Sequence, residues 1–354
     1  MNRRTFALLS ALITFTVGVV LAKLSLPNVL KTPPPVVVKD VQLSNYRLSG
    51  PYEFENLSIF LIHGPDATDC ALYTPLQQAM DRGTVIVHET NHVNELSIEN
   101  LSADDTVFVQ AGDIVKGGRQ DRVLSVDFIL PPHVGSVPIS AFCVEQSRWY
   151  ARGYESADQF TLTEMAANYS LRQAVVDVAT QAGVWNEVEA SQDKLTVALP
   201  KNVRSELSPT SLPLALENKA LQESTTPYID NLSPLAYRSN DVIGFAFALN
   251  DELKSADVYS SHAMFERLWP RLLKAATVEA VATPSIKRAP NALPIETVGA
   301  FLVNSELGSE TMTDINPRTV SVKRETEEGL FFETRDRGRN GAWIHRSYLK
   351  RIKN

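Results

Sequence analysis

The residue types and spacing best suited to chemistry lie in the run AGDIVKGGRQDR, which spans residues 111–122. Two adjacent glycines, Gly117 and Gly118, permit positive φ and let a backbone approach a ligand closely. Backbone N–H groups beside cations bind anions, so this stretch is a candidate anion cradle. The side chains that would complete the cradle are Lys116, Arg119, Gln120 and Arg122.

An internal pairing is the alternative interpretation of the same loop. Its cations would then pair with the carboxylates of Asp113, Asp121 or Glu145, because structural ion pairs are common in proteins. The run is not a Walker loop, since no lysine follows a GxxxxG turn into a helix, and a strand rather than a helix is expected after the glycines. The sequence therefore predicts no bound cofactor.

A second run, HETNH at residues 88–92, spells the HExxH pattern of zinc peptidases. On a helix, this spacing places two imidazoles on one face to hold zinc, and the glutamate activates a bound water. The preceding residues 84–87 favour a strand, and Thr-Asn is unfavourable within a helix. His88 and His92 are therefore weak candidates for metal ligands, and solvated histidines at a strand end are the simpler interpretation.

The elements that must position these residues are mostly strands in the first part of the folded body. Strand patterns, with one short helix over 72–82, give residues 50–150 the character of a β-rich lobe. The strands are expected at 57–63, 84–89, 106–110, 123–130 and 137–145.

Helical spacing dominates residues 155–280, and short strands are expected in the tail at 296–350. Two helices are expected at 161–182 and 261–280, and a buried strand at 242–249. Pro270 is expected to kink or split the second helix, and residues 205–235 indicate a long loop with one short helix. Together these patterns predict an α+β fold with a β-rich N-terminal lobe, central helices and a β-rich C-terminal tail.

The N-terminus is a different kind of sequence. Residues 1–22 carry Arg3 and Arg4 and then stay apolar, which is typical of a signal peptide or a single membrane anchor. A Pro-rich linker is expected at 23–44, before a folded domain over 45–350. The two arginines favour a cytoplasmic N-terminus and an exported body. We therefore expect a protein that is membrane-anchored facing the periplasm or cell exterior, or secreted after cleavage.

The overall composition excludes several classes of protein. Hydrophobic residues make up 44% and charged residues 21%, which excludes a disordered chain and a polytopic membrane protein. A net charge of −7 argues against a general nucleic-acid binder. Two cysteines, Cys70 and Cys143, exclude a disulfide scaffold and a Cys-rich zinc site. A single disulfide between them is compatible with export and stays open.

Two stretches, GGRQDR at 117–122 and CVEQSRW at 143–149, resemble the ARG and rhodanese-phosphatase-superfamily-associated protein domain family. Leu171-Arg172, the segment GFAFAL and the closing residues 344–347 are similar to it as well, and the resemblance covers most of 50–349. The family's name records an association with ADP-ribosylglycohydrolase-type and phosphatase-type proteins. The resemblance thus suggests a phosphorylated or nucleotide/ADP-ribose-like ligand.

By position, the resemblance implies that the Gly-Gly loop and its neighbours contact this ligand. The implied contacts are Lys116, Gly117, Gly118, Arg119, Gln120, Arg122, Arg148 and Trp149. Glu145 is a weak catalytic candidate that could serve as an acid or base, or simply pair with an arginine. Trp149 would either stack on a base or fill the core, and His345 is expected to be structural.

Three classes of function remain open. The first is a membrane-tethered extracytoplasmic domain that binds a small anionic molecule. The second is a structural or interaction module of the cell envelope, in which GGRQDR and CVEQSRW hold the core. The third is a hydrolase of such a ligand, with Glu145, Asp121 or Asp113 as acid or base. The membrane, through residues 1–22, is the other expected partner, and no nucleic acid is expected.

Overall fold

The computed structural model describes residues 39–43, 45–67, 73–286 and 293–351. The predicted signal or anchor at 1–22, most of the predicted linker and Cys70 lie outside the described residues, so these predictions stay open. Within the described ranges, no helix is long and apolar enough to cross a membrane.

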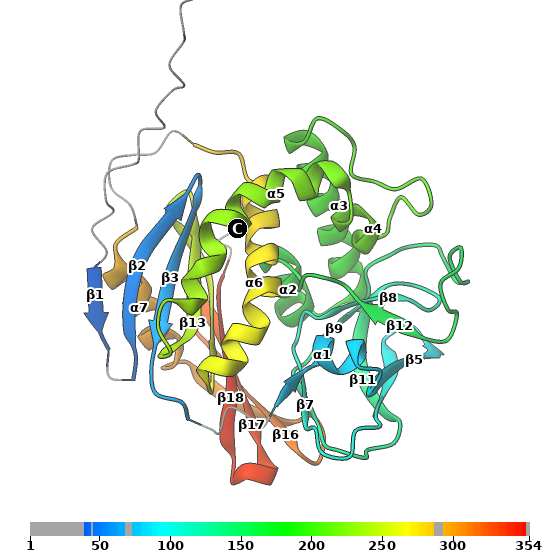
Figure 1. Cartoon of the computed structure of the whole chain (residues 1–354), viewed down its shortest axis with the longest axis horizontal. Coiled ribbons are helices and arrows are strands. Elements are labelled where there is room, and N and C mark those ends of the chain that lie inside the picture. Colours follow the sequence, from blue (N-terminus) through cyan, green and yellow to red (C-terminus); the bar gives the residue numbers. More distant parts are fainter. Residues whose placement is uncertain (1–38, 44, 68–72, 287–292, 352–354) are drawn as a thin grey trace, which may run out of the picture. The chain divides into compact units, whose positions relative to one another are not determined.

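A nine-stranded antiparallel sheet organises the folded body (Figure 1). In spatial order it contains β1 (Lys39–Gln42), β2 (Arg47–Phe54), β3 (Leu57–His63), β13 (Val242–Leu249), β14 (Glu252–Tyr259), β18 (Ala342–Lys350), β17 (Gly329–Asp336), β16 (Thr319–Glu325) and β15 (Ser309–Asp314). The predicted strands 57–63 and 242–249 are confirmed as β3 and β13, and every residue in both is buried. Continuous burial requires that both faces of the sheet are covered.

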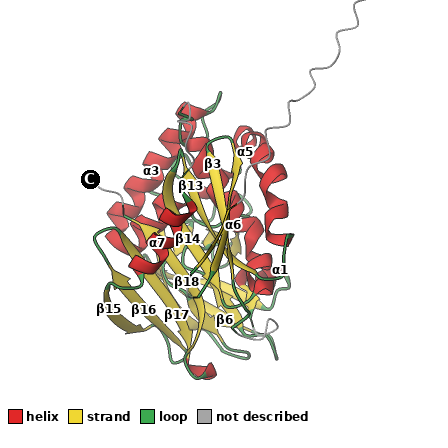
Figure 2. Cartoon of the chain, turned by 90° about the vertical axis from the view of Figure 1, so that its left-hand side faces the viewer, coloured by secondary structure: helices red, strands yellow, loops and turns green. Residues whose placement is uncertain are grey.

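Each face of this sheet has its own helical cover because side chains alternate along a strand. In β3, Ile59 packs in the core on the side of α6 (His262–Ala282) and α5 (Lys219–Leu232). The next residue, Phe60, packs in the core on the side of α7 (Ile295–Ser305). Figure 2 shows the helices gathered around the strands in this way.

A smaller β-lobe, coloured cyan to green in Figure 1, follows β3 in the chain. It combines a six-stranded and a three-stranded sheet with the short helix α1 (Leu76–Asp81). The first sheet orders β12 (Phe160–Leu162), β8 (Ile114–Gly117), β9 (Arg122–Leu124), β11 (Val137–Cys143), β6 (Glu95–Asn100) and β5 (Val85–His92), and the second orders β10 (Phe128–Leu130), β7 (Val107–Val109) and β4 (Thr74–Pro75). The β-rich lobe predicted from the sequence is therefore present.

Helices between the lobe and β13 complete the body. α2 (Tyr169–Gln173) is capped by Asn168, whose side chain accepts a hydrogen bond from the Leu171 N–H, and it continues into a π-helical turn (Ala174–Val178). The remaining elements are α3 (Gln181–Ala198), α4 (Leu212–Leu216) and the 3₁₀ turns Ser233–Tyr237 and Arg337–Arg339. Single π-helical turns are rare and occur often at functional sites.

The α+β class with β-rich ends is confirmed, and several element predictions need correction. The tail contains the helix α7, whose buried Val298, Phe301, Leu302 and Ser305 follow helical spacing. The segment 205–235 contains α4 and α5 instead of one short helix, and the sheet already begins with β1, inside the predicted linker 23–44.

Pro270 does not split the predicted helix at 261–280, because α6 is continuous from His262 to Ala282. The proline is exposed, whereas its neighbours Leu268, Trp269 and Leu272 are buried in the core. Burial of this face on both sides of the proline holds the two halves together despite the lost backbone hydrogen bond.

Candidate functional site

The Gly-Gly loop joins β8 to β9, and both glycines have the positive φ expected of them, 123° at Gly117 and 52° at Gly118. The backbone N–H groups of the loop, however, already have internal acceptors. The N–H of Gly117 donates to Asp121 Oδ1 at 3.0 Å, and the N–H of Arg119 donates to Glu89 Oε2 at 3.1 Å. These N–H groups thus bind carboxylates of the protein itself, as in the internal-pairing interpretation of the loop.

The charged residues of CVEQSRW belong to the same internal network. Arg148 Nη2 lies 2.7 Å from Glu145 Oε2, and Arg152 Nη1 lies 3.0 Å from Asp121 Oδ2. Glu145 is 0% exposed, and Ser208 donates a further hydrogen bond to it. Burial acts to raise the pKa of Glu145, but the hydrogen bonds from Arg148 and Ser208 lower it. This carboxylate is therefore held ionised and enclosed, which does not suit proton exchange with a ligand.

The other predicted contacts are divided between this network and the surface. Lys116 pairs with Glu217 at 2.7 Å, while the Gln120 amide donates to the Glu145 carbonyl and Arg122 is fully buried. Trp149 is 39% exposed, with the guanidinium carbons of Arg119 and Arg122 each 5.8 Å from its ring centre. Within the described residues, Arg119 has no ion-pair partner. Ligand contact at this loop stays a prediction, and only Arg119 and Trp149 are placed to make it.

The HExxH run lies on β5, so the helical spacing that zinc peptidases use is not formed. His88 Nε2 lies 2.8 Å from Glu99 Oε1, and Glu89 is bound to the Gly-Gly loop, away from both histidines. The described residues contain no group of three His, Cys, Asp or Glu side chains that could hold a metal ion.

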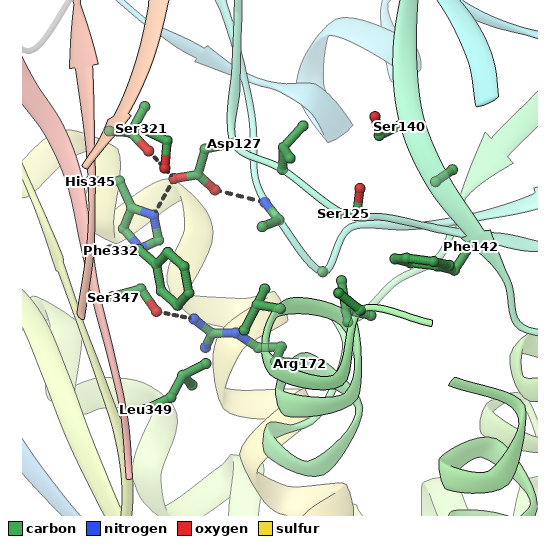
Figure 3. Close-up of a pocket in the computed structure, with 18 of the residues that line it drawn as sticks. Ser125, Asp127, Ser140, Phe142, Arg172, Ser321, Phe332, His345, Ser347 and Leu349 are labelled. Atoms are coloured by element: carbon green, nitrogen blue, oxygen red, sulfur yellow. Dashed lines mark hydrogen bonds and ion pairs between the residues drawn. The ribbon is translucent and has the colours of Figure 1, made fainter. Parts of the chain in front are cut away.

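A cavity of about 480 Å³ lies where the large sheet, the β-lobe and the π-helical turn meet; we call it the Asp127–His345 cavity (Figure 3). Its walls come from β16, β17 and β18, from β11, from residues 125–127 and from the turn that follows α2. The sequence predicted one strand over 123–130, but the strand breaks at 125–127 between β9 and β10. This break turns Asp127 toward β18.

Three charged side chains, Asp127, Arg172 and His345, form the floor of the cavity, and Asp257 lies behind them. His345 donates from Nδ1 to Asp127 Oδ2 at 2.7 Å and from Nε2 to Asp257 Oδ1 at 3.1 Å. Arg172 donates to both oxygens of Asp257, at 2.7 and 2.8 Å, and to Ser347 Oγ at 2.7 Å. His345 is 2% and Asp257 0% exposed, so the chain has buried a string of alternating charges.

The surroundings of His345 keep its imidazole protonated at neutral pH. Burial acts to lower the pKa of His345, but the charges and hydrogen bonds of Asp127 and Asp257 outweigh it and raise the pKa to about 9. Arg172 and His345 in turn lower the pKa of Asp257, although its burial acts in the opposite direction. All four side chains are consequently charged, and each lies in hydrogen-bonding contact with an opposite charge.

Above the floor, the walls of the cavity combine hydroxyl groups with apolar surface. Five hydroxyl side chains line it: Ser125, Ser140, Ser321, Thr334 and Ser347. Phe142, Phe332 and the π-helical residues Val175 and Val176 supply the apolar part, and Figure 3 shows Phe332 beside His345. Such a mixture of apolar walls and few fixed polar groups is typical of small-molecule sites.

Residues 45–349 match the profile of the ARG and Rhodanese-Phosphatase-superfamily-associated Protein domain. The chain belongs to this family. Arg172 and His345 both lie in stretches, 171–172 and 344–347, that resemble it. No curated protein and no solved structure matches the chain.

Sequence reasoning did not identify the Asp127–His345 cavity. The sequence predicts a structural role for His345 and places Asp127 only within the expected strand 123–130. The available signal was a charged residue directly flanked by apolar ones, as at Asp257 between Ala256 and Val258 in β14. Such residues are costly to bury unless they are paired, which makes them informative.

Proposed function

We propose that this domain binds a small anionic ligand with hydroxyl groups, such as a phosphorylated sugar or nucleotide-like compound, in the Asp127–His345 cavity. The observation that carries the proposal is the charge facing the cavity. Arg172, protonated His345 and Asp127 line it, whereas Asp257 lies behind them. The four charges of this network sum to about zero, but Asp257 does not line the cavity, so the two cations face it with Asp127 as the only lining anion of the four.

Arg172 also retains hydrogen-bonding capacity. A guanidinium has five N–H donors, and the contacts to Asp257 and Ser347 use three of Arg172's. None of its nitrogens is among the buried side-chain atoms that lack a partner in the described part of the chain. Nε has no acceptor among the described residues, so its N–H group is accessible, and the five wall hydroxyls add donors and acceptors for the hydroxyl groups of a sugar.

The arrangement favours binding over catalysis. Both ring nitrogens of His345 are occupied by carboxylates, and a pKa of about 9 leaves the imidazole without a free lone pair at neutral pH. A general base needs that lone pair. The size of the cavity, about 480 Å³, lies within the range of about 300–1,000 Å³ that is usual for small-molecule sites.

The test is thermal stabilisation and calorimetric titration of the full chain with ribose 5-phosphate, AMP and ADP-ribose. Ser321→Phe fills the cavity from β16 and should abolish the stabilisation seen with wild type. The control Ser309→Phe changes an exposed serine on β15 and should leave it intact. If the Ser321→Phe substitution disturbs folding, Ser140→Trp blocks the exposed rim instead. Undiminished binding in both cavity variants, or no binding by any of the three compounds, would refute the proposal.

We also propose that the domain acts outside the cytoplasm, tethered or secreted through residues 1–22. The basic-apolar start and the proline-rich segment after it support this. A reporter enzyme that folds only outside the cytoplasm, fused after Asn354, should be active. Loss of its activity on replacing Arg3 and Arg4 by glutamate would add support, whereas an inactive fusion to the unaltered chain would contradict the proposal.

A second candidate function, a structural or interaction module of the cell envelope, is favoured by one observation. The two stretches that resemble the family most specifically, GGRQDR and CVEQSRW, supply buried residues of a shared ion-pair network. In that case their role is to fix the β-lobe, and no ligand would stabilise the protein.

A further inference from the structure

A second cavity, of about 710 Å³, opens at one end of the nine-stranded sheet, and none of its lining residues belongs to the Asp127–His345 cavity. It is lined by β2, the end of β3, the residues before β13, and β18; we call it the Arg47–Arg346 cavity. β18 contributes to both cavities, because His345 faces the first and its neighbour Arg346 faces the second.

A chain of hydrogen bonds beside this cavity has the order of a nucleophilic triad. Ser49 Oγ lies 2.8 Å from His63 Nε2, and His63 Nδ1 lies 2.8 Å from Asp241 Oδ1. Burial decides against nucleophilic catalysis, because a nucleophile must be reached by substrate and its orienting carboxylate is normally the buried member. Here Ser49 is 3% exposed, while the side chain of Asp241 is 44% exposed. This series of hydrogen bonds therefore anchors His63 and Asp241 in the cavity wall.

Two guanidinium groups in the cavity wall have unused donors. Arg47 donates hydrogen bonds to Asp40 at 2.9 Å and to Asp241 at 2.8 Å. Arg346 donates to Glu333 at 2.7 Å and to Tyr46 Oη at 2.6 Å. Each arginine thus engages two of its five N–H groups within the described residues. Arg47 Nε and Arg346 Nη2 have no acceptor among the described residues and are not among the buried atoms without a partner, so these two nitrogens are accessible.

The charges and rings around these arginines define what the cavity could hold. Arg47, Arg346 and Asp241 are charged side chains of the wall, and the carboxylates of Asp40 and Glu333, which pair with the two arginines, lie outside it. The ring of Trp343 also lines the cavity, with the guanidinium carbon of Arg346 4.5 Å from its centre. Arginine beside an aromatic ring suits carboxylate or phosphate together with a planar group.

We propose that the Arg47–Arg346 cavity is a second ligand site, for a compound that joins a carboxylate or phosphate to a planar ring. The arginines hold the anionic group through their unused N–H donors, and the ring packs on the open part of Trp343. The hydrogen bonds from Ser49 through His63 to Asp241 hold Arg47 in place, because Asp241 is its partner.

The test uses the full chain with its tryptophans replaced by 5-fluorotryptophan and observed by ¹⁹F NMR in mild detergent. The chain has 4 tryptophans, at positions 149, 185, 269 and 343, and Trp343→Phe assigns the resonance of the cavity. The probes are AMP, benzoate and uncharged adenosine. We expect the Trp343 resonance to shift with AMP, benzoate or both, and not with adenosine; AMP alone would assign phosphate, and benzoate alone carboxylate.

Substitutions show whether the shift of the Trp343 resonance comes from a ligand in the Arg47–Arg346 cavity. Arg47→Gln should weaken binding about tenfold or more, since a hydrogen bond to a charged group contributes about 1.5–3 kcal/mol. Ala67→Phe should block the exposed rim, and the control Ala103→Phe, in a distant exposed loop, should bind as wild type does. Ser321→Phe should also bind normally, which separates this proposal from the first cavity.

Three outcomes would overturn the inference: a Trp343 resonance unmoved by both charged probes, an equal shift with adenosine, or a shift that survives in Ala67→Phe. A shift of Trp149 alone would do the same, and would place the ligand at the Gly-Gly loop instead.

Discussion

His345 is the residue on which the Asp127–His345 cavity depends. It joins Asp127, from the β-lobe, to Asp257, from the large sheet, and its ring stacks on Tyr259 with 4.7 Å between ring centres. Removing one member of a buried charge network leaves its partners unpaired, which costs several kcal/mol. His345 is therefore both a structural link and the cation that faces the ligand.

The protonation of His345 predicts how stability depends on pH. A histidine whose pKa is raised by folding, here from the usual 6.5 to about 9, stabilises the fold fully below about pH 6.5. That contribution is lost as pH rises through 9, and its size is on the order of 3 kcal/mol. We expect the free energy of unfolding, measured in urea from pH 6 to 9.5, to fall more steeply for wild type than for His345→Gln.

The two proteins should thus differ most near pH 6 and least above pH 9. Curves that run parallel over this range would show that His345 does not bind a proton on folding, and the charge assigned to the cavity floor would then be too positive by one.

At the scale of elements, the hairpin of β8 and β9 has the backbone chemistry that its sequence motif predicts, but it uses that chemistry inside the protein. Its glycines adopt the positive φ that the motif predicts, and its backbone does bind anions. The anions are Asp121, which lies in the loop itself, and Glu89, which β5 brings to the loop. The hairpin consequently fixes the β-lobe.

Substitution of two arginines separates the structural role of this hairpin from a role in binding. Arg148→Ala removes the nearer of the two arginines paired with Glu145 and the donor to the Gly117 and Gly118 carbonyls, so it should destabilise the protein by about 3 kcal/mol. Arg119→Ala removes only a contact with Trp149 and should cost about 1 kcal/mol or less. Both values are measurable by urea unfolding at pH 7.

A large loss of stability in Arg119→Ala would contradict this division of roles. A small loss combined with the disappearance of ligand-induced stabilisation would instead locate the ligand at Arg119, as the family resemblance first suggested.

At the scale of the molecule, the Asp127–His345 cavity is built by segments far apart in the chain. Asp127 and His345 are separated by 218 residues, and Arg172 and Asp257 by 85. The nine-stranded sheet forms one wall of the cavity and the β-lobe forms the other, and the π-helical turn lies between them. A ligand bound there would contact both parts of the body and so stabilise their association.

The sequence by itself determined the local structure and the residue chemistry. Periodicity identified β3, β13 and α6, and the glycine pair identified an anion-binding turn, because strand alternation, helical spacing and positive φ are properties of neighbouring residues. It missed α7 and the break at 125–127, since burial by distant elements decides whether a short apolar segment becomes helix or strand.

Only the tertiary structure decided which charges meet. Arg122 and Arg172 are the same residue type, yet the first is fully buried with Glu89 at 3.7 Å and the second faces a cavity. No local pattern distinguishes them, because the partners that neutralise a buried charge come from strands placed beside it by the sheet topology. The pairing of buried charges therefore places the candidate site at Arg172 and His345. It does not place it at the Gly-Gly loop, which is the most distinctive motif of the sequence.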